Sequence, residues 1–190
     1  MIILEGLKSS LVFEEQTLKG VYLISPDVYI DDRGYFFESF KEYDFKKHLN
    51  VRFVQDNEVL SAKVKTIRGL HYQIDNPQAK LIHVISGAIK DVIVDIRTSS
   101  SSFGKSFSIN LDHKNHKMLF IPEGFAHGYL VLEENTIVHY KCTDYYNPKS
   151  EYGIRWDDSD ININWGVDSP HISQKDSMLP FLKNQKILPK

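Results

Sequence analysis

Short apolar segments recur along most of the chain, and Gly, Pro, Asn, Asp or Ser residues separate them. The segments are rich in Val, Ile, Phe and Tyr, and several alternate between apolar and polar positions, a pattern typical of strands joined by turns. We therefore predict strands at 20–26, 35–40, 52–60, 66–73, 80–86, 88–97, 105–111, 116–124, 126–133 and 136–146.

Helical patterns are few and short. Segment 41–49 places Tyr43, Phe45 and Leu49 in an imperfect apolar stripe, and segment 176–184 is predicted as a short helix. The crossover helices that connect parallel strands are missing from the pattern. It therefore favours a sandwich or a jelly roll, and we predict a mostly β jelly roll with an open mouth and a few short helices.

Length and composition narrow the class of protein. The 190 residues suffice for one sizeable core, so we predict a single domain over 1–190. A formal net charge of −2 lacks the basic excess of nucleic-acid binders, so no nucleic-acid partner is expected. Cys142 is the only cysteine, which favours a reducing compartment. No apolar run reaches membrane-helix length and residues 1–10 lack a signal-peptide pattern, so we expect no membrane association and a cytoplasmic location.

The stretch RGLHYQ at 68–73 places polar side chains in a predicted strand. Alternation directs His71 and Gln73 to the same face, and Gly69 leaves room there because it has no side chain. This face is either the polar floor of a pocket or a solvated edge.

Two further strands carry charged residues. Alternation places Lys80 on one face of 80–86 and His83 on the other. In 88–97, Asp95 and Arg97 form either a surface ion pair at a strand end or a charged group that enters a pocket. The loop TSSSSFG that follows is predicted as a flexible turn, with ligand contact by its hydroxyls as the alternative.

Pro122, Gly124 and His127 have the spacing P-x-G-x-x-H, which resembles the second signature of the cupin barrels. In cupins that bind metal, this histidine joins an H-x-H pair and a glutamate. Here HYQ replaces the pair and no glutamate follows at a suitable distance. We therefore expect no metal site; His71 and His127 would be its ligands if one existed.

Without a metal, His71 has the chemistry of a general base. An imidazole accepts a proton at neutral pH when a carboxylate orients it. Removal of a proton next to a carbonyl produces an enolate, whose oxygen needs a cation or a hydrogen-bond donor. Lys80 is a candidate for that donor.

Eight motifs together resemble the dTDP-4-dehydrorhamnose 3,5-epimerase family, and the likeness covers about residues 18–182. They occur in the family's order: DDRGYFFESF, FVQDN, RGLHYQ, QAKL, DVIVDIR, FIPEGFAHGYLVL, HYKCTDYYNPKSEYGIRWDD and ISQKD. The resemblance implies a cupin-type jelly roll, a double-stranded β-helix, that works as a homodimer without a cofactor.

The resemblance also implies a role for particular residues. His71 matches the catalytic base, Asp176 the carboxylate that pairs with it, Lys80 the lysine near the 4-keto oxygen, and Tyr140 the general acid on the opposite face. Arg68 matches a contact to the pyrophosphate. Other positions match residues that hold the nucleotide, commonly across the dimer, or line the pocket: Arg33, Phe36 and Glu38 in the first group, and Gln55, Asn57, His127, Tyr146 and Asp95 in the second.

The function implied is inversion of C3, C5 or both in a nucleotide-linked 4-keto sugar, for surface polysaccharide biosynthesis. The substrate is of the dTDP-4-keto-6-deoxyhexose or the GDP-4-keto-heptose type. Three alternatives stay open: a 4-keto-sugar isomerase on the same fold, a metal-dependent cupin, and a sugar-binding module without catalysis. A binder of a neutral sugar needs no acid and base on opposing faces, so the set of His71, Lys80, Tyr140 and Asp176 favours an enzyme.

Overall fold

The computed structural model describes residues 10–190, so the prediction for the first residues, that they lack a signal peptide, lies mostly outside the described residues. Strands dominate this part of the chain. The strands are β1 (Leu11–Glu15), β2 (Tyr22–Pro26), β3 (Tyr29–Asp31), β4 (Gly34–Phe36), β5 (Gln55–Ser61), β6 (Ile67–Gln73), β7 (Lys80–Ser86), β8 (Ala88–Asp95), β9 (Ser106–Asp112), β10 (Met118–Ile121), β11 (Phe125–Val131), β12 (Thr136–Cys142) and β13 (Glu151–Gly153). The helices are α1 (Glu42–Leu49) and α2 (Gln174–Ser177), and a 3-10 turn covers Leu182–Asn184.

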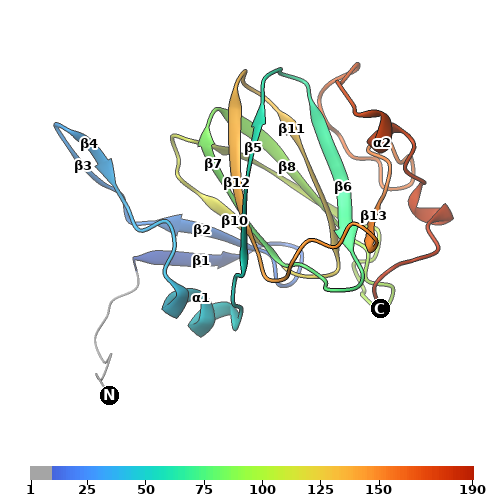
Figure 1. The fold of residues 1–190 in the computed structure, drawn as a ribbon, viewed down its shortest axis with the longest axis horizontal. Helices are drawn as coiled ribbons and strands as arrows, with labels where there is room; N and C mark the ends of the chain where they lie inside the picture. The colour runs from blue at the N-terminus through green and yellow to red at the C-terminus, as the bar shows by residue number, and fades with distance from the viewer. Residues whose placement is uncertain (1–9) are drawn as a thin grey trace.

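Two antiparallel sheets face each other and form the body of the molecule (Figure 1). One sheet has the order β1-β2-β10-β7-β12-β5, and the other has the order β13-β6-β11-β8-β9. Strands distant in sequence are neighbours in both, as in the pairing of β6 with β11 and of β7 with β12. This confirms the predicted mostly β jelly roll.

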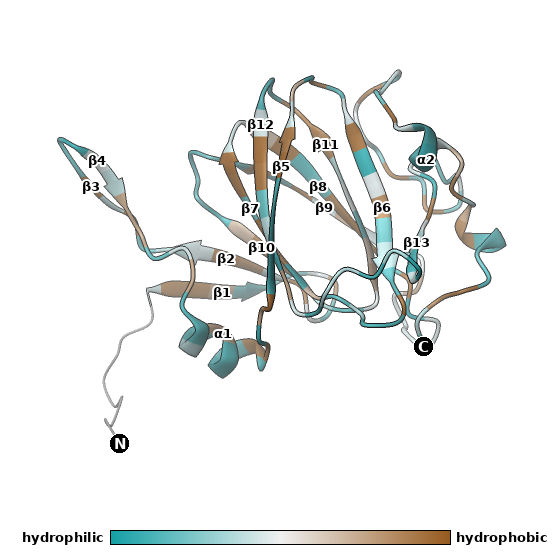
Figure 2. Ribbon diagram, viewed as in Figure 1, coloured by the Kyte–Doolittle hydropathy of each residue, from teal (hydrophilic) through white to brown (hydrophobic). Residues whose placement is uncertain are grey.

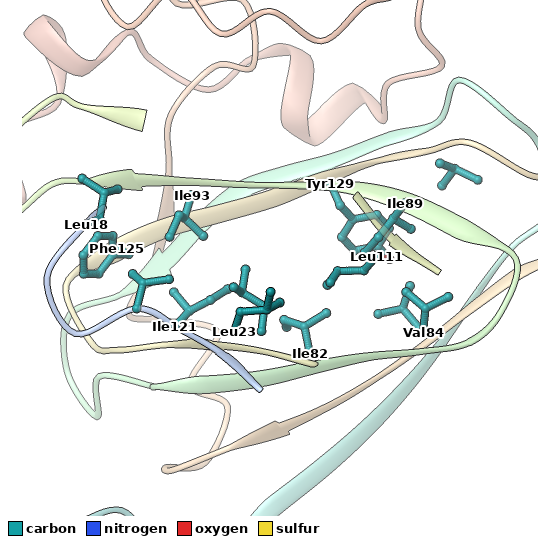
Figure 3. Packing of buried hydrophobic residues seen from close by; sticks show 14 residues of the cluster. Leu18, Leu23, Ile82, Val84, Ile89, Ile93, Leu111, Ile121, Phe125 and Tyr129 are labelled. Atoms are coloured by element: carbon teal, nitrogen blue, oxygen red, sulfur yellow. The ribbon is translucent and has the colours of Figure 1, made fainter. Parts of the chain in front are cut away.

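The main hydrophobic cluster lies between the two sheets (Figure 3). Ile82 of β7 comes from one sheet, and Ile93 of β8 and Phe125 of β11 come from the other. Full burial of each such side chain contributes roughly 1.5–3 kcal/mol to folding. Because Ile82 and Val138 also line a cavity of about 460 Å³, the packed core is at the same time the floor of that cavity.

A second cluster covers the outer face of the five-stranded sheet. Val92 and Val94 of β8 pack there with Ile154, Trp165 and Leu182 of the C-terminal segment. Figure 1 shows this segment in red beside β6 and β13. Its burial fixes the path of the chain that carries α2, and thereby brings Asp176 to the sheet edge.

Helix α1 packs through Phe45, which is fully buried with Phe120 and Leu11 in a third cluster. Acidic residues lie in its first turn and basic residues in its last, as the helix dipole favours, and Asn50 ends it in the left-handed conformation. No helix among residues 10–190 is long and apolar enough to cross a membrane.

Each predicted strand contains or overlaps an observed one, and the helix predicted at 41–49 is confirmed as α1. Strands β1, β3 and β13 were not predicted. A single helix over 176–184 is wrong: α2 ends at Ser177, and the 3-10 turn begins only after Pro180. Proline lacks the N–H that a continuous helix needs, and its ring disfavours helical geometry in the residue before it.

Strands β3 and β4 form a hairpin that projects away from the two sheets (Figure 1). Its side chains are exposed, with Ile30 at 81% and Phe36 at 66%. Large apolar side chains exposed side by side on a projecting hairpin are typical of an interaction surface.

Candidate active site

The main cavity, of about 460 Å³, opens between the sheets and is lined by residues of β5, β6, β7, β11, β12 and α2. A second cavity of about 320 Å³ adjoins it, and its walls include Gln55, Tyr146 and Glu151. Both cavities are lined by His71, Lys80 and Tyr140. These three side chains therefore stand where the two cavities meet.

His71 and Asp176 form a close pair at this junction. His71 Nε2 lies 2.7 Å from Asp176 Oδ1, and the Gly69 N–H donates to Asp176 Oδ2 at 3.2 Å. Helix α2, hydrophilic along its whole length in Figure 2, supplies Asp176, and Ser173 caps the helix by accepting from the Asp176 N–H at 3.0 Å.

The charge of Asp176 decides which nitrogen of His71 carries a proton. Burial acts to raise the pKa of Asp176, but the hydrogen bonds from His71 and Gly69 outweigh it, so the pKa lies below its usual value. An ionised carboxylate can only accept hydrogen bonds, so Nε2 is the protonated nitrogen. Nδ1 is left with its lone pair and can accept a proton.

Gly69 permits a close approach of β6 to β11. Its φ of +94° is strained for other residues, and a Cβ there would lie 2.5 Å from the carbonyl oxygen of His127. The room that Gly69 leaves is thus taken by the β11 backbone, and no space for a ligand results at that point.

Lys80 and Tyr140 come from the opposite sheet, on the neighbouring strands β7 and β12. The Lys80 ammonium lies 5.8 Å from the centre of the Tyr140 ring. Burial lowers the pKa of Lys80, and it raises the pKa of Tyr140 to about 12. Tyr140 therefore holds its proton at neutral pH and faces a cavity whose other wall carries His71.

His127 sits directly across from His71 in the β6–β11 register and has a carboxylate partner of its own. His127 Nε2 lies 2.9 Å from Asp91 Oδ2 and 3.1 Å from Asp91 Oδ1, and both side chains are buried. His127 lines the main cavity, as the sequence predicted for a pocket residue.

The predicted nucleotide contacts divide into two groups. Arg68 lines the main cavity and donates to Ser61 Oγ at 3.1 Å, whereas Gln55, Asn57 and Tyr146 line the second cavity. Gln55 Nε2 donates to Asn57 Oδ1 at 3.0 Å. The structure thus brings these four predicted residues to the two cavities.

Arg33, Phe36 and Glu38 lie outside both cavities of their own chain. Arg33 is on the projecting hairpin and pairs with Asp31 at 2.5 Å. Glu38 accepts a hydrogen bond from the Ser10 hydroxyl. None of the three lines either of the two cavities that His71 lines.

Asp95 is also absent from the cavities. Arg97 and the hydroxyls of Ser100 and Ser102 occupy its buried carboxylate, with distances from 2.6 to 2.9 Å. Burial opposes these hydrogen bonds, but they hold the pKa of Asp95 at about 2. The structure therefore does not place Asp95 in either cavity. The predicted ion pair with Arg97 at the strand end is present, but its carboxylate is buried and not on the surface. The serine-rich loop closes over the carboxylate.

Two residues that sequence reasoning missed complete the site. Glu151 Oε1 lies 3.9 Å from His71 Nδ1, and Glu151 Oε2 accepts from Lys175 and, at 3.1 Å, from the Tyr146 hydroxyl. Burial acts to raise the pKa of Glu151, but Lys175 and His71 outweigh it and lower the pKa. The position of Lys175, directly before Asp176, was the available signal; Glu151 gave none, because its strand has only three residues.

Among residues 10–190, no group of three or more His, Cys, Asp or Glu side chains is arranged so that it could hold a metal ion. The two histidines that the cupin comparison suggested, His71 and His127, each direct Nε2 at a carboxylate. The residues present therefore do not fit the ligand set of a metal-binding cupin.

The chain is similar over most of its length to one protein family. The family model for dTDP-4-dehydrorhamnose 3,5-epimerase matches residues 15–184. A dTDP-4-dehydrorhamnose 3,5-epimerase from Methanothermobacter thermautotrophicus is 49% identical over 168 residues, which is 86% of this chain and 90% of the relative. The Escherichia coli protein of the same name is 45% identical over 166 residues, covering 85% and 89% of the two chains.

Solved structures agree with this similarity. The crystal structure of dTDP-6-deoxy-D-glucose-3,5-epimerase from Legionella pneumophila, in complex with dTDP-4-keto-L-rhamnose, superposes with a TM-score of 0.91 at 37% identity. It covers 95% of this chain and 98% of the other. A 3'-monoepimerase from Streptomyces bikiniensis in complex with dTDP-quinovose has a TM-score of 0.87 at 27% identity, with 92% and 91% coverage.

Proposed function

Because the chain belongs to the dTDP-4-dehydrorhamnose 3,5-epimerase family, we propose that it inverts C3 and C5 of a dTDP-linked 4-keto-6-deoxy sugar. The observation that carries this proposal is the placement of an acid and a base on opposite walls of one cavity. His71, oriented by Asp176, stands on the five-stranded sheet, and Tyr140 stands on the six-stranded sheet.

Each inversion proceeds in two proton transfers. His71 Nδ1 removes the proton from the carbon next to the C4 ketone, and the electron pair moves onto the keto oxygen to form an enolate. The Lys80 ammonium stabilises that oxygen. Tyr140 then donates its proton to the carbon from the other face, which inverts the centre and restores the ketone. The ketone acidifies C3 and C5 alike, so one acid and one base serve both.

The second cavity and the adjoining wall of the main cavity suit the nucleotide. In the main cavity, Arg68 offers a guanidinium for the diphosphate. In the second cavity, Gln55, Asn57 and Tyr146 offer amides and an aromatic ring for the base. The relatives carry dTDP in their names and the Legionella structure holds a dTDP sugar, which favours dTDP over GDP. A relative named as a 3,5-epimerase is 49% identical to this chain, whereas the 3'-monoepimerase is 27% identical. This difference in sequence identity favours reaction at both C3 and C5.

A homodimer is the second part of the proposal. The hairpin β3–β4 exposes Tyr29, Ile30, Tyr35 and Phe36 beyond the body of the chain. In a homodimer, the hairpin of one chain supplies Arg33 and Phe36 to the nucleotide site of the other. Light scattering measures the mass, and a mixture of His71→Ala with Arg33→Ala chains tests the sharing, because mixed dimers then contain one intact site. Failure of the mixture to regain activity would argue against it.

The biological setting follows from the proposed reaction. The product would supply a deoxysugar to a surface polysaccharide, and the single reduced cysteine suits the cytoplasm. An isomerase of another type on this fold and a sugar-binding module remain the competing functions.

Deuterium uptake in heavy water separates these functions. The protein is incubated with dTDP- and GDP-linked 4-keto sugars in parallel, without added metal or cofactor, and uptake is followed by mass spectrometry and proton NMR. Uptake at C3 and C5 of the dTDP sugar is expected. Uptake at one centre would correct the regiochemistry, and none with either substrate would favour an isomerase of another type or a binding module.

A further inference from the structure

The connection between β12 and β13 carries Tyr146 and leads into Glu151, and glutamine side chains hold its backbone. Four consecutive residues of this connection, from 144 to 147, each use one backbone group in such a hydrogen bond. Three glutamines make these bonds, and we refer to them as the glutamine clamp: Gln55, Gln73 and Gln78.

Gln73 is the centre of the clamp because both ends of its amide are used. Its Nε2 donates to the carbonyl of Tyr145 at 3.0 Å, and its Oε1 accepts from the N–H of Asn147 at 2.9 Å. A third bond joins Nε2 to the carbonyl of Asn76. The side chain is only 8% exposed and its residue pairs with Glu151 across β6 and β13. Gln73 is therefore not a solvated edge residue. It lines the second cavity, but its amide is already bonded to the chain.

The other two glutamines fix the neighbouring positions. Gln55 Oε1 accepts from the Tyr146 N–H at 2.9 Å, and Gln78 Nε2 donates to the Asp144 carbonyl at 2.8 Å. The backbone on both sides of Tyr146 is thus held while its side chain stays 52% exposed at the second cavity. The Tyr146 hydroxyl donates to Glu151, so one fixed segment presents both groups.

We propose that Gln73 is a positioning residue that holds the segment of Tyr146 and Glu151 in the conformation that binds the nucleotide part of the substrate. The inference rests on the proposed function. An exposed aromatic ring on a free loop loses conformational entropy when a ligand orders it, and a loop fixed beforehand avoids that loss. Because the Gln73 amide bonds to this loop and not to His71 or Tyr140, we expect its loss to act mainly on affinity. It can reach proton transfer only through Glu151, whose Oε1 lies 3.9 Å from His71 Nδ1.

Gln73→Met tests this role because methionine has a similar length but makes none of the three hydrogen bonds of the Gln73 amide. We expect the Kd for dTDP, measured by calorimetry, and the KM for the dTDP 4-keto sugar to rise about tenfold, with kcat changed less than about twofold. Gln185→Met is the matched control. It removes one amide bond, at 3.0 Å, to the carbonyl of Gly153 in the same strand β13, and should leave Kd and KM unchanged.

A double-mutant cycle with Tyr146→Ala separates positioning from a general loss of structure. If Gln73 acts through Tyr146, the Kd of the double variant equals that of Tyr146→Ala alone. Additive losses, an unchanged Kd in Gln73→Met, or a fall in kcat as large as the rise in KM would overturn the proposal. If Gln73→Met does not fold, Gln78→Met tests the clamp at its edge, where about a threefold rise in Kd is expected and no rise would overturn it.

Deuterium exchange and dTDP binding distinguish a failure of the proposed function from a failure of the role of Gln73. If the wild-type protein neither exchanges deuterium nor binds dTDP, the proposed function is wrong and the clamp as a nucleotide device is wrong with it. If the wild type does both and Gln73→Met binds dTDP equally well, only the role of Gln73 is wrong.

Discussion

Two histidine–carboxylate pairs stand side by side on the wall of the main cavity. His71 on β6 pairs with Asp176, and His127 on β11, its partner in the strand register, pairs with Asp91. The nitrogen-to-oxygen distances, 2.7 and 2.9 Å, are nearly the same. The chemistry of the two pairs alone therefore does not distinguish a base from a supporting group.

The surroundings of the two histidines differ more than their carboxylate pairs do. The His71 side chain is 26% exposed and that of His127 is 9% exposed. Asp176 comes from the separate helix α2, whereas Asp91 belongs to β8, hydrogen-bonded to β11. Both histidines line the main cavity, but the side chain of His71 is the more exposed of the two. This difference in access, more than the pairing, supports His71 as the base in the proposed mechanism.

Replacement of His71 is expected to have the largest effect. His71→Ala removes the proton acceptor but none of the nucleotide contacts, so deuterium exchange should fall by about 10³-fold while dTDP binding changes little. Mass spectrometry and calorimetry measure the two quantities. His127→Ala is the matched variant. If it abolished exchange and His71→Ala did not, the assignment by access would be reversed.

Tyr140→Phe tests the wall opposite to His71. In the proposed mechanism the hydroxyl donates the proton in the second step, so completed inversion should fall by about 10²-fold and initial proton loss by less. Product analysis by NMR, with exchange measured in the same sample, gives both rates. Equal loss of both would mean that Tyr140 does not act as the acid of the second step.

The two carboxylates allow a direct comparison by the same substitution. Asp176→Asn removes the anion that fixes and stabilises His71, so kcat should fall about 30-fold, whereas Asp91→Asn should lower kcat by less than about threefold. Initial rates at saturating substrate measure this. Losses of similar size would show that both pairs take part in proton transfer.

The pattern of alternation predicted which side chains of β7 share a face, though not which face points inward. Ile82 packs between the sheets and Leu81 packs in the cluster near α1, so the two residues lie on different faces. The short edge strand β13 was missed because its three residues, Glu151 among them, have too few positions for a period to show. Edge segments of this kind acquire their structure from the strand they pair with.

Asp95 shows where a motif stops being informative. Its place in a matching motif suggested the pocket, but its partners Ser100 and Ser102 lie in a loop that was read as a flexible turn. Which hydroxyls close over a carboxylate depends on the loop path, which no local periodicity reports. By contrast, His71 and Asp176 are 105 residues apart in the chain, and only the resemblance to a family could pair them.

A third buried histidine, His83, extends the comparison, because it has no carboxylate partner among residues 10–190. It lies on the outer face of the six-stranded sheet, opposite His139 in the register and 5.8 Å from the ring of Phe37. Burial, with the charges of His139 and His116, lowers its pKa from 6.5 to about 4. The unfolded chain therefore binds a proton more readily than the folded one between these pH values.

This difference sets the sign of a pH effect. The contribution of His83 is fully present above pH 6.5 and is lost as the pH falls towards 4, by at most about 3 kcal/mol of unfolding free energy. Glutamine cannot take up a proton. The unfolding free energy of His83→Gln should therefore fall less than that of the wild type as the pH falls from 6.5 to 4, measured by urea unfolding at a series of pH values. His171→Gln, at an exposed histidine, is the control and should keep the wild-type slope. If the slope of unfolding free energy against pH were the same in His83→Gln as in the wild type, the folded protein would accommodate a charged His83. The imidazole could then be buried here in its charged form without a carboxylate partner.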